Sequence, residues 1–129
     1  MPEAYARNPE RVWADLIEGN RRFIENRPQP RDFTAERATV ATRQTPKAVV
    51  LACADSRVAP EIVFDQTLGD LFVVRGAGNT ADACDLCSIE FAVKELGVPL
   101  LVVIGHTHCA GGYESVAWKC VGILSQRRA

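Results

Sequence analysis

The sequence predicts an α/β fold of three layers, a mostly parallel β-sheet flanked by helices, with an N-terminal amphipathic helix arm. Two observations carry this prediction. Three short aliphatic runs lack polar alternation, as strands covered on both faces do. Helical segments alternate with these runs, which is typical of right-handed βαβ units. The chain has 129 residues, the size of one domain, so we expect residues 1–129 to form a single domain.

Two helices are expected before the sheet. Residues 8–27 place apolar side chains at helical spacing, with Asn8 as a candidate N-cap and Pro9 at the first helical position. An isolated helix of this length is marginal in water, so it needs a surface to cover. Residues 28–33 form a connection that contains prolines, and residues 34–44 are expected to form a shorter helix.

The sheet and its crossovers follow. The three aliphatic runs that we expect to form strands are residues 48–52, 71–74 and 100–104. Residues 60–65 are expected to form one or two helical turns between the first two strands. Residues 82–96 are expected to form a helix between the last two, which Gly97 could end as its C′ residue.

Composition and charge exclude several classes of protein. The 47% hydrophobic and 24% charged residues are ordinary globular values and argue against disorder or a coiled coil. The net charge of -1 gives no hint of a nucleic-acid or acidic-membrane partner. No window is apolar enough for a signal peptide or a membrane span, so we expect a cytoplasmic protein. Its five cysteines are then more typical of metal binding or catalysis than of disulfides.

Three potential metal ligands meet at one edge of the predicted sheet. Cys53 ends the first strand, and His106 follows the third in a turn that also contains Cys109. Ligands bind outside the carboxyl ends of strands in open parallel sheets. Zinc accepts thiolate and imidazole ligands, and a catalytic zinc site leaves one position open for water. Taken singly, each residue has an ordinary structural explanation, but together with the charged residues beside them they predict a zinc site.

Those charged residues are Asp55 and Arg57, which lie two and four residues beyond Cys53. An arginine next to a carboxylate keeps it ionised and orients it, and a fixed carboxylate near zinc can accept a hydrogen bond from bound water. The alternative is a loop ion pair that contributes little at the surface. The position beside a candidate metal ligand favours a functional pair.

The order and spacing of these motifs closely resemble the β-class carbonic anhydrase family. The motifs that carry the resemblance are CADSRV (53–58), FVVR (72–75), AGN (77–79), SIEF (88–91) and GH (105–106) with Cys109. The segment LIEGNRRF (16–23) is also similar to that family's opening helix. The resemblance covers roughly residues 10–109.

The resemblance implies that Cys53, His106 and Cys109 hold one Zn²⁺ per chain and that Asp55 and Arg57 form the catalytic dyad. It implies reversible hydration of carbon dioxide to bicarbonate and a proton, in which zinc lowers the pKa of bound water to about 7. It also implies an inactive arrangement, in which the aspartate takes the fourth zinc position and its pair with the arginine is broken.

Further residues are assigned to substrate by the resemblance alone. It implies that Gln44 helps to bind substrate or bicarbonate across a dimer interface. It implies that Phe72, Ala77 and Phe91 line a narrow apolar pocket for carbon dioxide. We therefore expect a homodimer or a higher homo-oligomer. Members of the family with the same zinc site hydrolyse carbonyl sulfide or carbon disulfide, and composition does not separate these substrates.

The chain departs from the family pattern in three places. Ala110 follows Cys109 where glycine is usual, and Gly76 replaces the usual asparagine. The chain ends at Ala129, so we expect it to lack the family's usual C-terminal portion, which would cover a sheet edge and extend the dimer. A catalytically impaired zinc-binding remnant is therefore an alternative to an active enzyme.

Two other interpretations remain open. Cys84 and Cys87 could join His106 and Cys109 in a closed, structural zinc site, but that set leaves the CADSR motif unexplained. Residues 76–81 fit the nucleotide-binding pattern G-x-G-x-x-A, but the next strand does not end in the ribose-binding acid that this pattern requires. The sequence assigns no role to His108 or Cys120.

Overall fold

The structure is a computed structural model that describes residues 8–110 and the backbone of residues 121–122. Its elements in chain order are α2 (Pro9–Ile24), α3 (Phe33–Val40), β1 (Ala48–Cys53), α4 (Pro60–Val63), β2 (Leu71–Gly76), the 3-10 turn η1 (Ala77–Asn79), α5 (Ala83–Lys94), β3 (Leu101–Val103) and β4 (Val121–Gly122). The sequence predicted the place and type of each of these except η1 and β4. Neither exceeds three residues, too few to produce a periodic pattern.

The described strands form one sheet in the order β2-β1-β3-β4. β1 pairs in parallel with β2 and with β3, and β4 adds an antiparallel edge to β3. The predicted mostly parallel sheet is therefore confirmed. Because β1 is central, the chain must cross over it between β2 and β3, and α5 makes that crossover.

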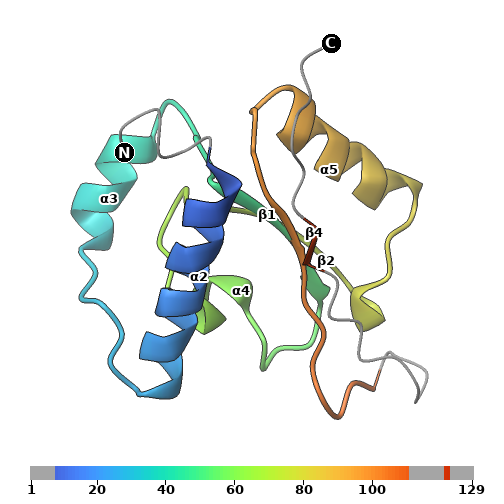
Figure 1. Ribbon diagram of the computed structural model, residues 1–129. Helices are drawn as coiled ribbons and strands as arrows, with labels where there is room; N and C mark the ends of the chain where they lie inside the picture. The colour runs from blue at the N-terminus through green and yellow to red at the C-terminus, as the bar shows by residue number, and fades with distance from the viewer. Residues whose placement is uncertain (1–7, 111–120, 123–129) are drawn as a thin grey trace.

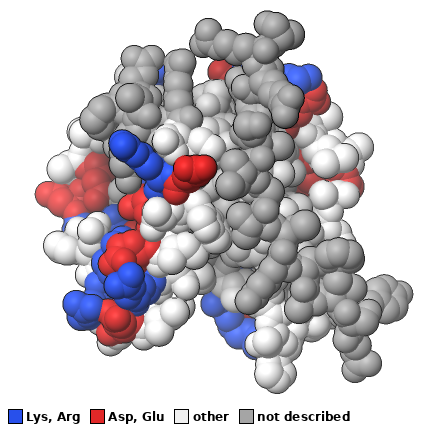
Figure 2. Space-filling view, viewed as in Figure 1, with Lys and Arg blue, Asp and Glu red and all other residues white. Residues whose placement is uncertain are grey.

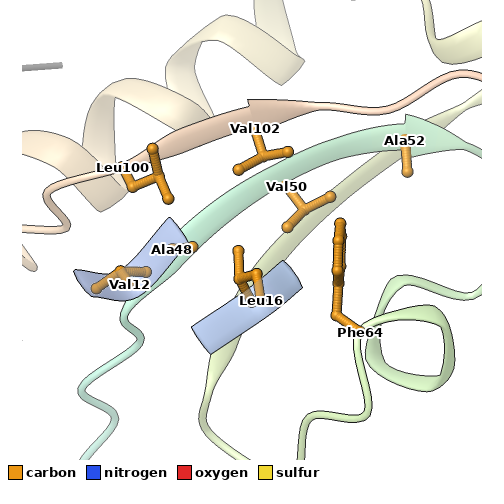
Figure 3. Packing of buried hydrophobic residues seen from close by; sticks show 8 residues of the cluster. All are labelled: Val12, Leu16, Ala48, Val50, Ala52, Phe64, Leu100 and Val102. Atoms are coloured by element: carbon orange, nitrogen blue, oxygen red, sulfur yellow. The ribbon is translucent and has the colours of Figure 1, made fainter. Parts of the chain in front are cut away.

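Helices cover both faces of the sheet, which confirms the three predicted layers (Figure 1). On one face, two α2 side chains pack against the sheet in a cluster made of Val12, Leu16, Ala48, Val50, Ala52, Phe64, Leu100 and Val102 (Figure 3). On the other face, Ala92 of α5 packs with Val49 and Val98. All six residues of β1 are buried, so this strand joins the two clusters.

The N-terminal amphipathic helix, α2, lies directly on its own sheet. Its start is fixed as predicted, since the Asn8 side chain accepts a hydrogen bond from the Arg11 backbone N–H (3.1 Å) and Pro9 follows. Gly19 allows the closest approach, because a Cβ there would lie 1.8 Å from the Phe64 carbonyl oxygen. Any side chain at this position would push α2 away from the segment that follows α4.

The ends of all four predicted helices differ from the structure. α2 ends at Ile24 rather than at residue 27, and α4 ends at Val63 rather than at residue 65. α3 ends at Val40, four residues before the predicted end; it buries no residue, so packing gives it no reason to continue. α5 ends at Lys94 rather than at residue 96, with Glu95 as its C-cap, so Gly97 lies one position beyond C′ and takes a left-handed φ of 66° there.

Charge is mixed on the surface of the described residues. On the face drawn in Figure 2, acidic and basic side chains lie next to one another over the region of α2 and α3. None of the described helices is both long and apolar enough to cross a membrane.

Candidate metal centre

Three side chains converge beyond the carboxyl ends of β1 and β3. Cys53, His106 and Cys109 each offer one ligand atom, and these atoms lie within 4.8 Å of one another. The two sulfur atoms are 3.7 Å apart. Among the described residues, no second group of three histidine, cysteine or acidic side chains has this spacing. The structure thus brings together the three residues that the sequence predicted as ligands.

Backbone pairing continues beyond the strands to the point where the ligands begin. The Ala54 N–H donates to the Gly76 carbonyl (2.9 Å), and the Ile104 N–H donates to the Leu51 carbonyl (3.0 Å). In the loop after β3, His108 takes a left-handed φ of 56°, which is uncommon for a residue with a side chain. This turn lets one short loop present both of its ligands toward the end of β1.

The protonation of Cys53 suits a metal ligand. Burial raises the pKa of this thiol, but contact with His106 and two backbone N–H groups outweighs burial and lowers the pKa to about 6. Those N–H groups belong to Asp55 and Gly78, at 3.4 and 3.2 Å from Cys53 Sγ. The thiolate, which is the form that binds metals, is therefore favoured.

His106 supplies the clearest sign that a metal fits here. Its Nε2 atom is buried and has no hydrogen-bond partner among the described residues, whereas its Nδ1 lies 3.0 Å from the Thr107 carbonyl oxygen. A buried polar atom without a partner costs free energy. Metal-binding histidines commonly donate their other ring N–H to a carbonyl, as this geometry allows. Two thiolates and an imidazole form a donor set that suits zinc.

Asp55 and Arg57 form a two-pronged ion pair beside these ligands. Arg57 Nε donates to Asp55 Oδ1 (2.9 Å), Nη2 donates to Oδ2 (2.6 Å), and the Arg57 backbone N–H also donates to Oδ1 (2.9 Å). These bonds hold the pKa of Asp55 well below its usual range. Asp55 Oδ2 lies 3.9 Å from His106 Nε2, so an ionised carboxylate faces the ligand set. Arg57 also donates to the His108 carbonyl (3.0 Å), linking the two loops.

Sequence reasoning did not find the role of Gly78. The loop that fits a nucleotide-binding pattern instead directs the Gly78 N–H at the Cys53 sulfur, and Gly78 has a φ of 71°. Its neighbour Ala77, predicted to line the substrate pocket, is exposed at this same end of the sheet. No pattern of residue types distinguishes a glycine that donates to sulfur from one that only turns the chain.

Two other predicted pocket residues lie away from this chain's own metal centre. Phe72 pairs in register with Val49, and its ring centroid is 6.3 Å from that of Phe91. Val49 precedes Cys53 by four residues, about 13 Å along a strand. Phe91 is 47% exposed. These two rings therefore lie near the surface of the chain and do not surround its candidate ligands.

Gln44 also lies far from the ligands of its own chain. It is exposed and precedes the first residue of β1 by four positions, at the amino edge of the sheet. The structure therefore does not bring Gln44 to the metal centre within one chain.

Cys84 and Cys87, the other two cysteines in the described part of the chain, do not join the ligand group. Cys84 and Cys87 are exposed on α5, and the described residues do not assemble the alternative four-residue zinc site that includes them. Cys120 lies outside the described residues. A hollow of about 590 Å³ lies elsewhere, between the end of α2 and the segment after α4, and no residue of the metal centre lines it.

Comparison with known proteins is consistent with this geometry. The sequence pattern of the carbonic anhydrase family matches residues 48–122. Carbonic anhydrase 2 of Mycobacterium tuberculosis is 55% identical over 103 residues, which cover 79% of this chain and 50% of that protein. Carbonic anhydrase of Mycolicibacterium smegmatis is 52% identical over the same shares of both chains. The chain thus spans about half the length of these curated relatives.

A solved structure is also similar. The β-carbonic anhydrase of Coccomyxa, solved in complex with acetazolamide, is 32% identical and superimposes with a TM-score of 0.55. The match covers 73% of this chain and 43% of that protein.

Proposed function

Because this chain belongs to the β-class carbonic anhydrase family, we propose that it catalyses the reversible hydration of carbon dioxide to bicarbonate and a proton. One observation supports this most strongly. An ionised carboxylate, Asp55, lies 3.9 Å from His106 Nε2, a buried atom without a hydrogen-bond partner in the described part of the chain. In a structural zinc site the protein fills all four positions, so a carboxylate held beside the ligands by an arginine would have no water to orient.

The metal in this proposal is one Zn²⁺ per chain, held by Cys53, His106 and Cys109. Catalytic zinc sites typically have three protein ligands and one water, so these three residues would leave a position for water. When bound, zinc supplies Lewis acidity that lets water lose a proton near neutral pH. The depressed pKa of Cys53 supports binding of zinc at that pH, because less free energy is needed to deprotonate the thiol.

Asp55 would orient the nucleophile. An ionised carboxylate can only accept hydrogen bonds, so it pairs with the hydrogen that the attacking oxygen still carries and turns that oxygen's lone pair toward carbon dioxide. Arg57 keeps the carboxylate ionised and fixes its plane through two parallel hydrogen bonds. The 15% exposure of the Asp55 side chain limits competition from bulk water.

The substrate pocket would be shared between two copies of the chain. Gln44, Phe72 and Phe91 lie away from their own metal centre, so only a partner could bring them to a site. β2 supports this assembly, because it is an edge strand of the described sheet and pairs only with β1. Sedimentation should show a homodimer or a larger species. A stable, compact monomer at high concentration would contradict the shared pocket.

Stopped-flow hydration of carbon dioxide by the purified chain tests the function, with zinc content measured on the same sample. We expect hydration above the buffer rate and one zinc per chain. A fully zinc-loaded sample that only matches the buffer rate would reject the proposed activity. Carbonyl sulfide and carbon disulfide should be assayed in parallel, since a preference for either would reassign the substrate.

A further inference from the structure

A second arginine, Arg75, contacts the loop that carries the dyad carboxylate. Near the end of β2, its Nε atom donates to the Cys53 carbonyl (2.9 Å) and its Nη2 atom donates to the Asp55 carbonyl (2.7 Å). The two carbonyls lie at the two ends of residues 53–55, the segment by which the chain leaves β1 and which we call the turn. One end bears the first metal ligand and the other bears the carboxylate.

The end of β2 therefore holds this turn at three points. Arg75 lies opposite Ala52 in the strand register, so its side chain reaches forward past the end of β1. The neighbouring Gly76 carbonyl accepts from the Ala54 N–H, in the middle of the turn (2.9 Å). Backbone pairing fixes the centre of the turn, and the guanidinium fixes both of its ends.

We propose that Arg75 is a positioning residue for the hydration reaction, which fixes the distance between the Cys53 sulfur and the Asp55 carboxylate by bonding to both ends of the turn. This inference rests on the proposed function. It assigns different tasks to the two arginines. Arg57 fixes the orientation of the carboxylate itself, whereas Arg75 fixes the backbone from which that carboxylate extends.

The geometry requires an arginine. A planar guanidinium presents several N–H donors at fixed separations, so it can bond to two carbonyls at once. A lysine ammonium is a compact charge on a flexible stem and does not present two donors in that fixed fork. Arg75→Lys should therefore keep the positive charge but lose much of the positioning.

The test compares Arg75→Ala and Arg75→Lys with a matched control, Arg37→Ala. Arg37 is also an exposed arginine that donates to a backbone carbonyl, that of Phe33 (3.2 Å), but this bond lies within its own helix, α3. Loss of a residue that orients metal-site groups typically costs about tenfold to a hundredfold in activity. We expect kcat to fall by that factor in both Arg75 variants, with KM and zinc content unchanged, and to stay within about twofold in the control.

Two further measurements separate positioning from simple support of the fold. Added guanidinium ion should restore part of kcat in Arg75→Ala, because it can occupy the space left by the side chain. The visible absorption spectrum of the cobalt(II)-loaded protein should change in Arg75→Ala but not in Arg37→Ala, since a displaced carboxylate alters the environment of the metal. This spectrum needs no activity.

The outcomes are distinct. If the unmodified, zinc-loaded chain does not hydrate carbon dioxide, the proposed function fails, and the cobalt spectrum alone decides whether Arg75 positions the turn. An unchanged cobalt spectrum in fully loaded Arg75→Ala would overturn the inference. So would a loss of kcat that follows only a lower melting temperature and is not rescued by guanidinium.

Discussion

Two aspartates of this chain are each held by arginine, yet their surroundings differ. Asp55 is bound by one arginine, Arg57, whose side chain is 60% exposed, and the carboxylate faces the proposed metal ligand His106. Asp65 is bound by two arginines, Arg22 and Arg31, whose side chains are only 18% and 19% exposed. The comparison shows that an arginine–carboxylate pair does not by itself mark a reactive site. What the carboxylate faces decides its role.

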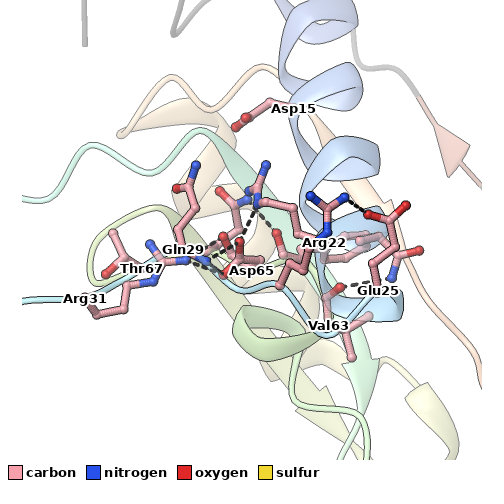
Figure 4. A network of polar contacts seen from close by, with 12 residues as sticks. Asp15, Arg22, Glu25, Gln29, Arg31, Val63, Asp65 and Thr67 are labelled. Atoms are coloured by element: carbon pink, nitrogen blue, oxygen red, sulfur yellow. Dashed lines mark hydrogen bonds and ion pairs between the residues drawn. The ribbon is translucent and has the colours of Figure 1, made fainter.

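The oxygens of Asp65 are fully used by the protein. Arg22 donates to Oδ2, Arg31 donates to Oδ1 (2.7 Å), and the Gln29 backbone N–H lies within reach of both oxygens (3.3 and 3.1 Å). Figure 4 shows these groups converging on Asp65 from the end of α2 and from the connection that follows it. Asp65 therefore joins that connection to the segment after α4, which is a structural task.

Removing a metal ligand gives the largest effect that we expect, because the ligands are what distinguish the surroundings of Asp55. Cys53→Ala should abolish stoichiometric zinc, since only two protein ligands remain. The double variant Cys84→Ala with Cys87→Ala should keep it. Elemental analysis after dialysis measures both. Zinc retained without Cys53 but lost in the double variant would establish the alternative structural site.

Removing the buried carboxylate should mainly destabilise the fold. Asp65→Ala removes the carboxylate that two largely buried arginines share, a change that typically costs about 3–5 kcal/mol of unfolding free energy, although Arg31 keeps its bond to the backbone carbonyl of residue 65 (2.7 Å). Urea denaturation of the zinc-loaded protein measures this loss, while activity per folded molecule should be retained. The control Glu18→Ala, which breaks an exposed pair with Arg21, should change stability by less than about 1 kcal/mol. Equal losses of unfolding free energy in Asp65→Ala and Glu18→Ala would show that the ion pairs of Asp65 do not stabilise the fold more than an exposed pair does.

Asp55→Asn should lower activity and leave stability almost unchanged, the opposite of what we expect for Asp65→Ala. It keeps the shape of the side chain but replaces one carboxylate oxygen with a donor, so the proposed acceptor for the nucleophile is lost. We expect carbon dioxide hydration to fall by about a hundredfold, with zinc content and unfolding free energy almost unchanged. If hydration instead matches that of the unmodified chain, the dyad assignment is wrong even with the metal correctly placed.

A smaller effect is expected in acid. Burial raises the pKa of Asp65, but the hydrogen bonds from Arg22, Gln29 and Arg31 outweigh it and hold the pKa below its ordinary value. A depressed pKa contributes stability above the pKa of the unfolded chain, about 3.9, and this contribution is lost as the pH falls through the folded value. The difference in unfolding free energy between the unmodified chain and Asp65→Asn should thus be constant from about pH 5 to 8 and shrink below about pH 4. A difference that persists at low pH would show that charge is not its source.

Much of the arrangement of the candidate metal centre could be predicted because its signals are local. Arg57 follows Asp55 by two residues, and His106 and Cys109 share one short loop. Only the proximity of that loop to Cys53 depends on the fold. It could be predicted because ligands bind where parallel strands end, at one edge of the sheet. The alternation of apolar runs and helices was likewise strong enough to give the order of the elements.

Contacts between distant segments could not be predicted in the same way. The arginines that bind Asp65 precede it by 43 and 34 residues, with no motif that connects them. The same is true of the Gly78 N–H that reaches the Cys53 sulfur. Such contacts depend on exact placement after packing, which residue types alone do not specify.

X-ray absorption at the zinc edge of the zinc-loaded chain tests the central claim most directly, because it counts the ligands without requiring activity. Coordination by Cys53, Cys109 and His106 predicts two sulfur neighbours at about 2.3 Å and two nitrogen or oxygen neighbours at about 2.0–2.1 Å. Three sulfur neighbours with a single nitrogen would contradict it. That count would fit the alternative site of Cys84, Cys87, His106 and Cys109, in which Cys53 and the dyad beside it lack the role proposed for them.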